Sequence, residues 1–600
     1  MKISDLLVTI AVLIGLSSFV MFAATAHSEA IDSPRDSLAS SPIQISHTQR
    51  PNIVILFVDD MGFSDVGCFG GEIETPHLDS LAANGLRLSQ FYNTSRCCPS
   101  RASLLTGLYQ HQAGIGMMVY RNYGQGYEGN LTNRCVTFGE VLQTAGYQTM
   151  LVGKWHAGHE PESRPEVRGF EKFTGVYPHI DSYWKVLKTC DIYRDKALLI
   201  PAGEEPINPY DPLREFYTTD FFTDVAIDYI DQALEDASRP FLLHACYNVP
   251  HFPLEAPEDL IEKYEGRYLK GWDRLRQEKL QRMKAMGLIG PKQKLPTVKG
   301  FVNERISGFT EVGIDSKVLP TWDSLSRQEQ EELDFRRALY AAQIDRFDQN
   351  VGRLVGHLKK RGILDNTLIL FFSDNGCSGE MDPFGMNWGK YSRADYRQWR
   401  KKGGWSISQG QCWASYSNTP LRKFKKFVHE GGIASPFIAH WPAGIEQPGR
   451  IYHGQFFHLI DIMPTLCDIA GATYPQRFKG KEIISAQGIS MLPYFKSPLV
   501  DSSKVRTLYW QHENHAAIRE GNWKLVTVND RNDQQWELYD FTDDRSETRD
   551  LSVEYPQMVN HLKVKWHQWA RQVNVLPFPE NRDSRQGIPW PPRPWSENKK

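Results

Sequence analysis

The feature that most constrains the fold is a short apolar segment that recurs along the chain and ends each time in polar residues. The four copies are NIVILFVDDMG, GYQTMLVGKWHAGH, RPFLLHACYNVPH and NTLILFFSDNG. The first contains a continuous apolar run over 53–58, which is the length of a strand. Strands that are apolar on both faces are typical of the centre of a parallel sheet covered by helices.

Helical patterns separate these apolar segments. One is TFGEVLQTAGY, which follows Val136, and a longer one extends over 340–362 with apolar residues at helical spacing. Strands that alternate with helices predict an α/β fold, here a large, mainly parallel sheet flanked by helices. Such sheets bind ligands outside the carboxyl ends of their strands, so we expect the polar groups at the four strand ends to converge.

The polar groups at these strand ends predict a site for a metal and an anion. The residues are Asp59, Asp60, Lys154, His156, His251, Asp374 and Asn375. Carboxylate and amide oxygens are hard ligands that suit calcium or magnesium rather than zinc, while lysine and histidine complement an anion. Taken singly, an Asp-Asp or Asp-Asn-Gly after a strand is more often a turn, and a lone histidine is more often structural. The agreement among four strand ends favours a functional site.

Two adjacent cysteines lie in the segment SRCCPSRASLLTG, over 95–107. Pro99 suits the first turn of a helix, and the residues that follow continue a helical pattern. Cys97 and Cys98 are therefore expected at or just before a helix amino terminus, where an anion is favoured. Cysteines in such a position can be reactive.

The pattern Cys-x-Pro-Ser-Arg, then three residues and Leu-Thr-Gly, counted from Cys97, resembles the signature of the type I sulfatases. These formylglycine-dependent enzymes include the arylsulfatases and belong to the alkaline phosphatase superfamily, and the resemblance extends over roughly residues 52–551. It implies that Cys97 is oxidised to formylglycine by a formylglycine-generating or equivalent enzyme. Cys98 occupies the variable position, where a packing or disulfide role is expected.

The same resemblance implies roles for the residues at the strand ends. One divalent cation, calcium or alternatively magnesium, would bind Asp59, Asp60, Asp374, Asn375 and an oxygen of modified Cys97. Catalytic roles would fall to Cys97, Arg101, Lys154, His156, His251 and Lys425. Lys425 follows from counting back from Glu430 in PLRKFKKFVHEGG, a segment that departs from the family pattern at Lys423 and, four residues after Glu430, at Ala434. A solvated basic loop is the alternative for the neighbouring Lys423 and Lys426.

The implied reaction is hydrolysis of an aryl or carbohydrate sulfate ester. One hydroxyl of the hydrated formylglycine attacks sulfur in line, and His251 or Lys425 protonates the departing alcohol. His156 then takes a proton from the second hydroxyl, so that sulfate leaves and the aldehyde is regenerated. Arg101 would hold the diol, while Lys154, Lys425 and His251 would neutralise charge on the sulfuryl oxygens, which is usually the largest catalytic contribution.

The charge of the chain argues against nucleic acid as a partner. Its 69 basic and 71 acidic residues nearly balance, and no long run has one sign. The expected partner is instead a sulfated small molecule or a sulfated glycan. Beyond the amino-terminal segment no stretch is long and apolar enough to cross a bilayer, so no stable membrane span is expected.

The sequence divides into five parts. Residues 1–26 have a lysine, an apolar stretch and an Ala-Thr-Ala ending, which predicts a cleaved signal peptide and a secreted or periplasmic protein; an uncleaved anchor is the alternative. Residues 27–49 are expected to be a disordered lead-in. Residues 50–500 would form the catalytic domain and 501–576 a smaller subdomain on an antiparallel sheet. Residues 577–600 are rich in Pro and Arg and are expected to be extended.

Three further features have two readings each. The charged insertion over 258–330 is expected to be a surface helix, with a lid over the site as the alternative. His512, Asn514 and His515 either line the pocket or are exposed on a hairpin. The nine cysteines show no spaced disulfide or zinc framework, although pairing of the eight other than Cys97 is permitted.

Two other functions are compatible with parts of the sequence. One is a phosphatase or phosphodiesterase of the alkaline phosphatase superfamily, which the cysteine at the nucleophile position and the oxygen-rich ligand set disfavour. The other is an inactive, secreted glycan-binding relative. A residue is present for every role that the sulfatase reaction needs, and this disfavours the second alternative.

Overall fold

The computed structural model describes residues 50–119, 122–187, 190–204, 206–298, 319–380, 383–386, 393–396, 407–497, 500, 505–513, 515–527 and 535–577. All of them fall within one compact unit, over 45–600. The expected signal peptide over 1–26, the lead-in over 27–49 and nearly all of the tail over 577–600 lie outside the described residues, as does Asn514. The boundary at residue 500 stays a prediction.

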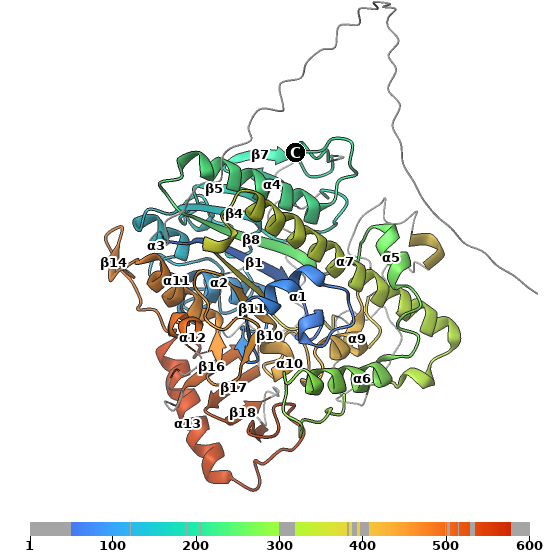
Figure 1. Ribbon diagram of the computed structural model, residues 1–600. Coiled ribbons are helices and arrows are strands. Elements are labelled where there is room, and N and C mark those ends of the chain that lie inside the picture. Colours follow the sequence, from blue (N-terminus) through green and yellow to red (C-terminus); the bar gives the residue numbers. More distant parts are fainter. Residues whose placement is uncertain are drawn as a thin grey trace, which may run out of the picture. The chain divides into compact units, whose positions relative to one another are not determined.

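A large ten-stranded sheet runs through this unit (Figure 1). Its five central strands, from β9 to β5 in spatial order, are parallel, and β2, β11, β6 and β7 include antiparallel pairings at the two sides. The α/β prediction is confirmed, with a mixed sheet whose centre is parallel. In spatial order the strands are β12 (Arg450–Tyr452), β2 (Leu86–Leu88), β11 (Phe437–His440), β9 (Thr367–Ser373), β1 (Asn52–Asp59), β8 (Phe241–Pro250), β4 (Gln148–Lys154), β5 (Lys172–Val176), β6 (Ile192–Arg194) and β7 (Ala197–Ile200).

Helices cover both faces of the central strands. The helices α4 (Thr218–Ala233) and α7 (Arg327–Lys360) pack on β8 and on each other (Figure 1). Successive residues of β1 face opposite sides: Val54 and Leu56 belong to the core under α4 and α7. Ile53 and Ile55 belong to a second core with α2 (Cys97–Thr106), α3 (Phe138–Thr144) and α11 (Ile462–Ala470). This two-sided burial explains why β1 is a continuous apolar run.

The register of the central strands aligns their carboxyl ends. Val58 lies opposite Ser373 in β9, and Asp59 lies opposite Pro250 in β8. The backbone N–H of Asp374 donates to the carbonyl of Val58 at 3.1 Å, which continues the pairing past the last strand residue. The polar residues that follow β1, β8 and β9 therefore meet at one edge of the sheet.

The described part of the insertion between β8 and α7 includes the helices α5 (Glu258–Tyr264) and α6 (Trp272–Ala285). One face of α6 is buried, so the expectation of a surface helix holds for its other face alone. Lys279 on the buried face is an ion-pair partner of Glu72 at 3.2 Å and lies 3.7 Å from the centre of the Tyr416 ring. Among the described residues, no helix combines the length and apolar character that crossing a membrane requires.

A second, four-stranded sheet follows the large one, as the sequence predicts. It is antiparallel and packs against the carboxyl-terminal helix α13 (Pro556–Gln572). Its strands are β16 (Thr507–His512), β17 (His515–Glu520), β18 (Trp523–Thr527) and β19 (Trp536–Asp540).

A buried charge network joins this small sheet to the part of the chain that contains the large sheet. The ammonium of Lys524 in β18 pairs with Glu430 at 3.0 Å and with Glu547 at 2.8 Å, and all three side chains are excluded from solvent. Glu430 begins the short helix α10 (Glu430–Ile433), and its second oxygen accepts from the guanidinium of Arg545 at 2.8 Å. Burial and the nearby Glu430 raise the pKa of Glu547 to about 7, against the opposing effect of Lys524.

Replacing Lys524 tests this network. In Lys524→Met two buried carboxyl groups lose their shared cation, so we expect the free energy of unfolding to fall by about 3–5 kcal/mol. The measurement is the midpoint of urea unfolding. The control is Lys481→Met, at an exposed position of the β14–β15 hairpin (Arg477–Phe478 and Lys481–Glu482). Equal midpoints for the two variants would contradict the role given to Lys524.

Candidate functional site

Four predicted metal ligands come together where β1 and β9 end. The backbone N–H of Asp60 donates to the carboxylate of Asp374 at 3.2 Å. The side-chain amide of Asn375 donates to the carboxylate of Asp60 at 2.6 Å. Asp59, Asp60, Asp374 and Asn375 are all buried. The structure thus brings together two pairs of adjacent residues that are more than 300 positions apart in the sequence.

The backbone at Asp60 is strained to serve this cluster. Its φ is 68°, in the left-handed region that a residue with a side chain rarely adopts. The hydroxyl of Tyr340 in α7 donates to the carbonyl of Asp60 at 3.2 Å, and the N–H of Met61 donates to Ser373 Oγ at 3.1 Å. These contacts hold the turn in place, and strain of this kind is typical of functional sites.

The oxygens of the cluster fit a hard cation. Asp59 Oδ1, Asp60 Oδ2 and Asn375 Oδ1 are buried, and none accepts a hydrogen bond from the residues that the structure describes. Ligand atoms of Asp59, Asp60 and His251 lie within 4.8 Å of one another. Buried oxygens left without a hydrogen bond are costly unless an ion binds them, so the donor set suits calcium or magnesium.

Two basic side chains lie on the side of Asp59. Lys154, at the end of β4, forms an ion pair with Asp59. The guanidinium of Arg101 in α2 lies 3.6 Å from Asp59 and 3.4 Å from Asp374, and it donates to the carbonyl of Lys154 at 2.8 Å. Burial opposes ionisation of Asp59, but Lys154, His251 and Arg101 together lower its pKa. Burial and the charge of Asp59 raise the pKa of Asp374 well above its usual value.

Two further basic groups lie on the side of Asp60. Lys425 Nζ is 2.7 Å from Asp60 Oδ1, and His251 Nε2 is 3.6 Å from Asp60 Oδ2. The neighbouring lysines have other contacts: Lys426 pairs with Glu380, and Lys423 lies over the Phe427 ring. The structure therefore places Lys425 at the site, as the predicted assignment requires.

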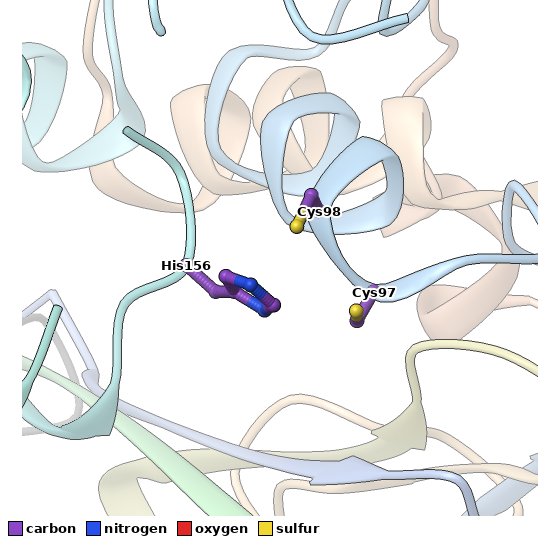
Figure 2. Close-up of side chains that lie close together, drawn as sticks. All are labelled: Cys97, Cys98 and His156. Carbon is purple, nitrogen blue, oxygen red and sulfur yellow. The ribbon is translucent and has the colours of Figure 1, made fainter. Parts of the chain in front are cut away.

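Cys97 is the first residue of α2, and His156 follows β4 in an adjacent loop. Figure 2 shows the imidazole of His156 directed toward Cys97 and Cys98. Ligand atoms of the three residues lie within 4.8 Å of one another. A hydrogen bond from the Cys98 thiol, with Lys154 and His156 nearby, holds the pKa of the Cys97 thiol well below its usual value. Burial and the proximity of Cys97 raise the pKa of Cys98.

All nine cysteines lie among the described residues, and Cys97 and Cys98 are free thiols. The structure therefore shows no disulfide at Cys98. Cys246 and Cys377 are buried in the core near the strand ends, which agrees with a packing role.

Several residues near the site were not singled out by sequence reasoning. Tyr340 and Ser373 support the turn after β1, and the ring of His179 lies 5.9 Å from that of His156. Tyr340 is one of many buried positions in α7, so nothing in the surrounding sequence indicated that it contacts the site. A cavity of about 510 Å³ lined by Glu140, Glu171 and Lys479 contains none of the predicted site residues.

The cation site can be tested by calcium-dependent stability. Binding to the folded state alone at 100 times the dissociation constant adds about 2.7 kcal/mol, so calcium should raise the unfolding temperature of the parent protein and chelator should reverse this. Asp374→Ala should lose most of the increase. The control is Asp365→Ala, at an exposed position before the other end of β9. Full retention of the calcium effect in Asp374→Ala would refute the ligand assignment.

Comparison with known proteins agrees with this geometry. Residues 51–472 match the family model described as Sulfatase, and residues 423–572 match one described as N-sulphoglucosamine sulphohydrolase, C-terminal. An uncharacterized sulfatase of Schizosaccharomyces pombe is 31% identical over 564 residues, which cover 89% of this chain and 96% of the relative. An arylsulfatase of Klebsiella aerogenes is 30% identical over 454 residues, which cover 74% and 91%.

Solved structures share the fold. One, crystallised in complex with k-i-k-neocarrahexaose, has a TM-score of 0.59 at 22% identity and covers 87% of this chain and 93% of its own. Another, in complex with its substrate D-glucosamine-2-N,6-O-disulfate, has a TM-score of 0.55 at 22% identity and covers 89% and 100%. Because the family match spans most of the sequence and includes every residue of the site, the chain belongs to the sulfatase family and is a sulfuric ester hydrolase.

Proposed function

We propose that this sulfatase hydrolyses aryl or carbohydrate sulfate esters through a formylglycine at position 97 and one divalent cation, calcium or magnesium. The observation that supports this most directly is the placement of Cys97 beside His156, next to buried carboxylates and basic groups. The family match favours sulfate over phosphate as the transferred group, against the phosphatase alternative.

The nucleophile requires a modified Cys97. In the conversion the side chain exchanges its sulfur and two hydrogens for one oxygen, and a formylglycine-generating or equivalent enzyme carries out the oxidation. The hydrated aldehyde then has two hydroxyls on the same carbon. Its position at the first residue of α2 places it where the helix favours an anion.

The cation would be held by Asp59, Asp60, Asp374 and Asn375, together with an oxygen of modified Cys97. It would supply positive charge beside the nucleophile, and charge of this kind lowers the pKa of a bound hydroxyl. The protein's own basic groups would bind the remaining sulfuryl oxygens, and their fixed positions stabilise the charge that develops during transfer.

In the first step one hydroxyl at residue 97 attacks sulfur, and the bond from sulfur to the substrate alcohol breaks. His251 or Lys425, both within 3.6 Å of Asp60, would give the departing oxygen its proton. Arg101 would keep the diol oriented through its contacts with Asp59 and Asp374. The enzyme is then sulfated at residue 97.

In the second step His156 takes the proton of the remaining hydroxyl. The carbon–oxygen bond to sulfate breaks, sulfate leaves, and the aldehyde is restored. Serine at this position would lack the second hydroxyl, so its sulfate ester would have no group to expel the product. This difference explains why the reaction needs a diol.

The protein is further proposed to act outside the cytoplasm, as a secreted or periplasmic enzyme. The support is the amino-terminal sequence, with its lysine, apolar stretch and Ala-Thr-Ala ending. A test is the amino-terminal sequence of the mature protein from its source, which should begin at His27. A mature chain that retains residues 1–26 would contradict cleavage.

Alanine variants of the two cysteines can distinguish a catalytic role, proposed for Cys97, from a packing role, proposed for Cys98. Cys97→Ala should abolish hydrolysis of 4-nitrophenyl sulfate, whereas Cys98→Ala should retain most of it because the diol remains. In active protein, trypsin should release the peptide CCPSR with an aldehyde at Cys97 and an intact thiol at Cys98, as read by mass spectrometry. Fully active enzyme with an unmodified Cys97 thiol would overturn the mechanism.

The role of His156 predicts a separation of the two steps. His156→Ala should complete the first transfer and then stall, because no group removes the proton of the second hydroxyl. Rapid mixing with 4-nitrophenyl sulfate should give a burst of at most one equivalent of nitrophenol per active site. His159→Ala, a nearby histidine outside the proposed set, serves as the control. Steady turnover of His156→Ala at the parent rate would exclude this role.

The reaction class is tested by a matched pair of substrates. The parent enzyme should hydrolyse 4-nitrophenyl sulfate with a higher kcat/KM than 4-nitrophenyl phosphate. A clear preference for the phosphate would favour the phosphatase alternative, and no turnover of sulfated compounds despite a modified Cys97 would favour an inactive glycan-binding relative.

A further inference from the structure

We propose that three buried residues, Asp65, Arg337 and Tyr340, are positioning residues for the cation site. They are here called the support cluster. They lie behind the turn after β1 and hold it in the shape in which Asp60 directs its carboxylate toward Asn375. The proposal rests on the proposed function, because it takes Asp60 as a ligand of the divalent cation. Each member would act through Asp60 rather than on the substrate.

The turn after β1 needs support from outside its own residues. Asp60 has φ of 68°, which a residue with a side chain rarely adopts, and such a conformation persists only where neighbouring contacts determine it. A Cβ atom at Gly62 would lie 2.5 Å from the carbonyl oxygen of Ser417. The turn is therefore pressed closely against the chain at Ser417, and the position of Asp60 depends on the groups around it.

Asp65 closes the turn from within the same loop. Its Oδ2 accepts from the backbone N–H of Gly62 at 2.8 Å. The hydroxyl of Tyr340 lies 2.7 Å from the same Oδ2 and 3.2 Å from the carbonyl oxygen of Asp60, so its single hydrogen is shared between the two oxygens. One carboxylate oxygen thus connects the backbone of the turn to helix α7.

Arg337 holds Asp65 in place from α7. It lies one helical turn before Tyr340, and its guanidinium donates to Asp65 Oδ1 at 2.9 Å. It also donates to Ser417 Oγ at 2.7 Å and to Glu72 at 3.1 Å. All three members of the support cluster are at most 1% exposed. Because the guanidinium is a rigid planar fork, these acceptors fix its orientation and, through it, the orientation of the Asp65 carboxylate.

The charges around the support cluster balance. Glu72 pairs with Lys279 of α6 at 3.2 Å as well as with Arg337 at 3.1 Å. Two carboxylates, of Asp65 and Glu72, therefore face two basic side chains. Burial opposes ionisation of Glu72, but Lys279 and Arg337 lower its pKa to about 2. Removing one member would leave an unpaired buried charge, so the set keeps its geometry as a unit.

The second pair of predicted ligands is connected to the same region. Asn418 Oδ1 accepts from the backbone N–H of Phe63 at 3.4 Å and from that of Cys377 at 3.1 Å. Phe63 belongs to the turn after β1, and Cys377 closely follows Asn375. A displaced turn would therefore change the spacing between Asp60 and Asn375. Metal affinity depends on such spacing, and replacing residues that orient metal ligands usually weakens binding.

The central test is Asp65→Asn, which keeps the shape of the side chain. The carboxylate accepts on both oxygens, whereas an amide has one accepting oxygen and an NH2 group that donates. In either orientation the amide directs a donor at a donor, toward Gly62 and Tyr340 or toward Arg337. Isothermal titration of chelator-treated enzyme with modified Cys97 should show that the Kd for calcium rises by about tenfold or more.

Two further variants separate positioning from stability. Tyr340→Phe removes only the hydroxyl and should also raise the Kd by about tenfold, so it decides the question if Asp65→Asn does not fold. The matched control is Asp348→Asn, at a buried position of the same helix that accepts from the backbone N–H groups of His77 and Leu78 at 3.0 and 2.8 Å. Asp348 holds α1 (Pro76–Ala83) rather than the turn. This variant should bind calcium with the parent Kd even where its unfolding temperature falls.

Turnover gives a second readout. In Asp65→Asn, kcat/KM for 4-nitrophenyl sulfate should be low at a calcium concentration that just saturates the parent. It should recover most of the parent value when calcium is raised well above the new Kd. We expect this recovery because a positioning residue changes how firmly the cation is held and leaves the reacting groups in place.

The outcomes separate the support cluster from the reaction. A parent Kd in Asp65→Asn, or in Tyr340→Phe where Asp65→Asn does not fold, would overturn the positioning role and leave the sulfatase function standing. An equal rise of the Kd in Asp348→Asn, or a kcat/KM that stays low at saturating calcium, would do the same. If the parent with modified Cys97 binds neither calcium nor magnesium, the proposed cation is refuted and the positioning role with it.

Discussion

The rest of the site depends on one electrostatic constraint, the burial of three carboxylates at adjoining strand ends. Asp59, Asp60 and Asp374 lie together out of contact with water, and charges in such surroundings are costly unless other charges compensate for them. Lys154 and Arg101 approach from one side, and Lys425 approaches from the other. The opposite shifts in pKa of Asp59 and Asp374 follow from this competition, since burial acts on both but the nearest cation pairs with Asp59. The need to balance this charge explains why basic groups lie beside the carboxylates. The same groups would contact a bound sulfate ester.

The sequence was sufficient to predict this cluster because its members follow strands that are parallel neighbours. A continuous apolar run indicates a central strand, and parallel pairing brings the carboxyl ends of β1, β8 and β9 to one edge. Asp59, Asp374 and His251 could therefore be placed together without knowledge of their distances. The edge strands were less predictable, because β6 and β7 are short and pair antiparallel, and their register depends on contacts outside their own sequence.

Residues outside the strand ends could not be placed by the same argument. Lys425 lies in an irregular segment, and its assignment among three lysines rested on resemblance alone; the structure distinguishes it by a contact with Asp60 that no local pattern encodes. Tyr340 supports the carbonyl of Asp60 from a position 280 residues away, within a helix whose sequence periodicity predicts burial but not a partner. Pairings of this kind depend on how helices pack against strands, which periodicity does not specify.

The buried charges of the site and the small carboxyl-terminal sheet differ in how much substitution they tolerate. The buried carboxylates and their cations belong to the large sheet and to α2, where replacing one charge leaves another unpaired and lowers stability. The hairpin tip that includes Glu513 belongs to the small sheet and is partly exposed, so substitutions there need not disturb the core. The Lys524 network fixes the position of the small sheet against α10, which directly follows the segment of Lys425 and Lys426. A rigid attachment at the base of this sheet and a partly exposed tip allow the tip to vary in sequence while the buried charges of the large sheet are kept.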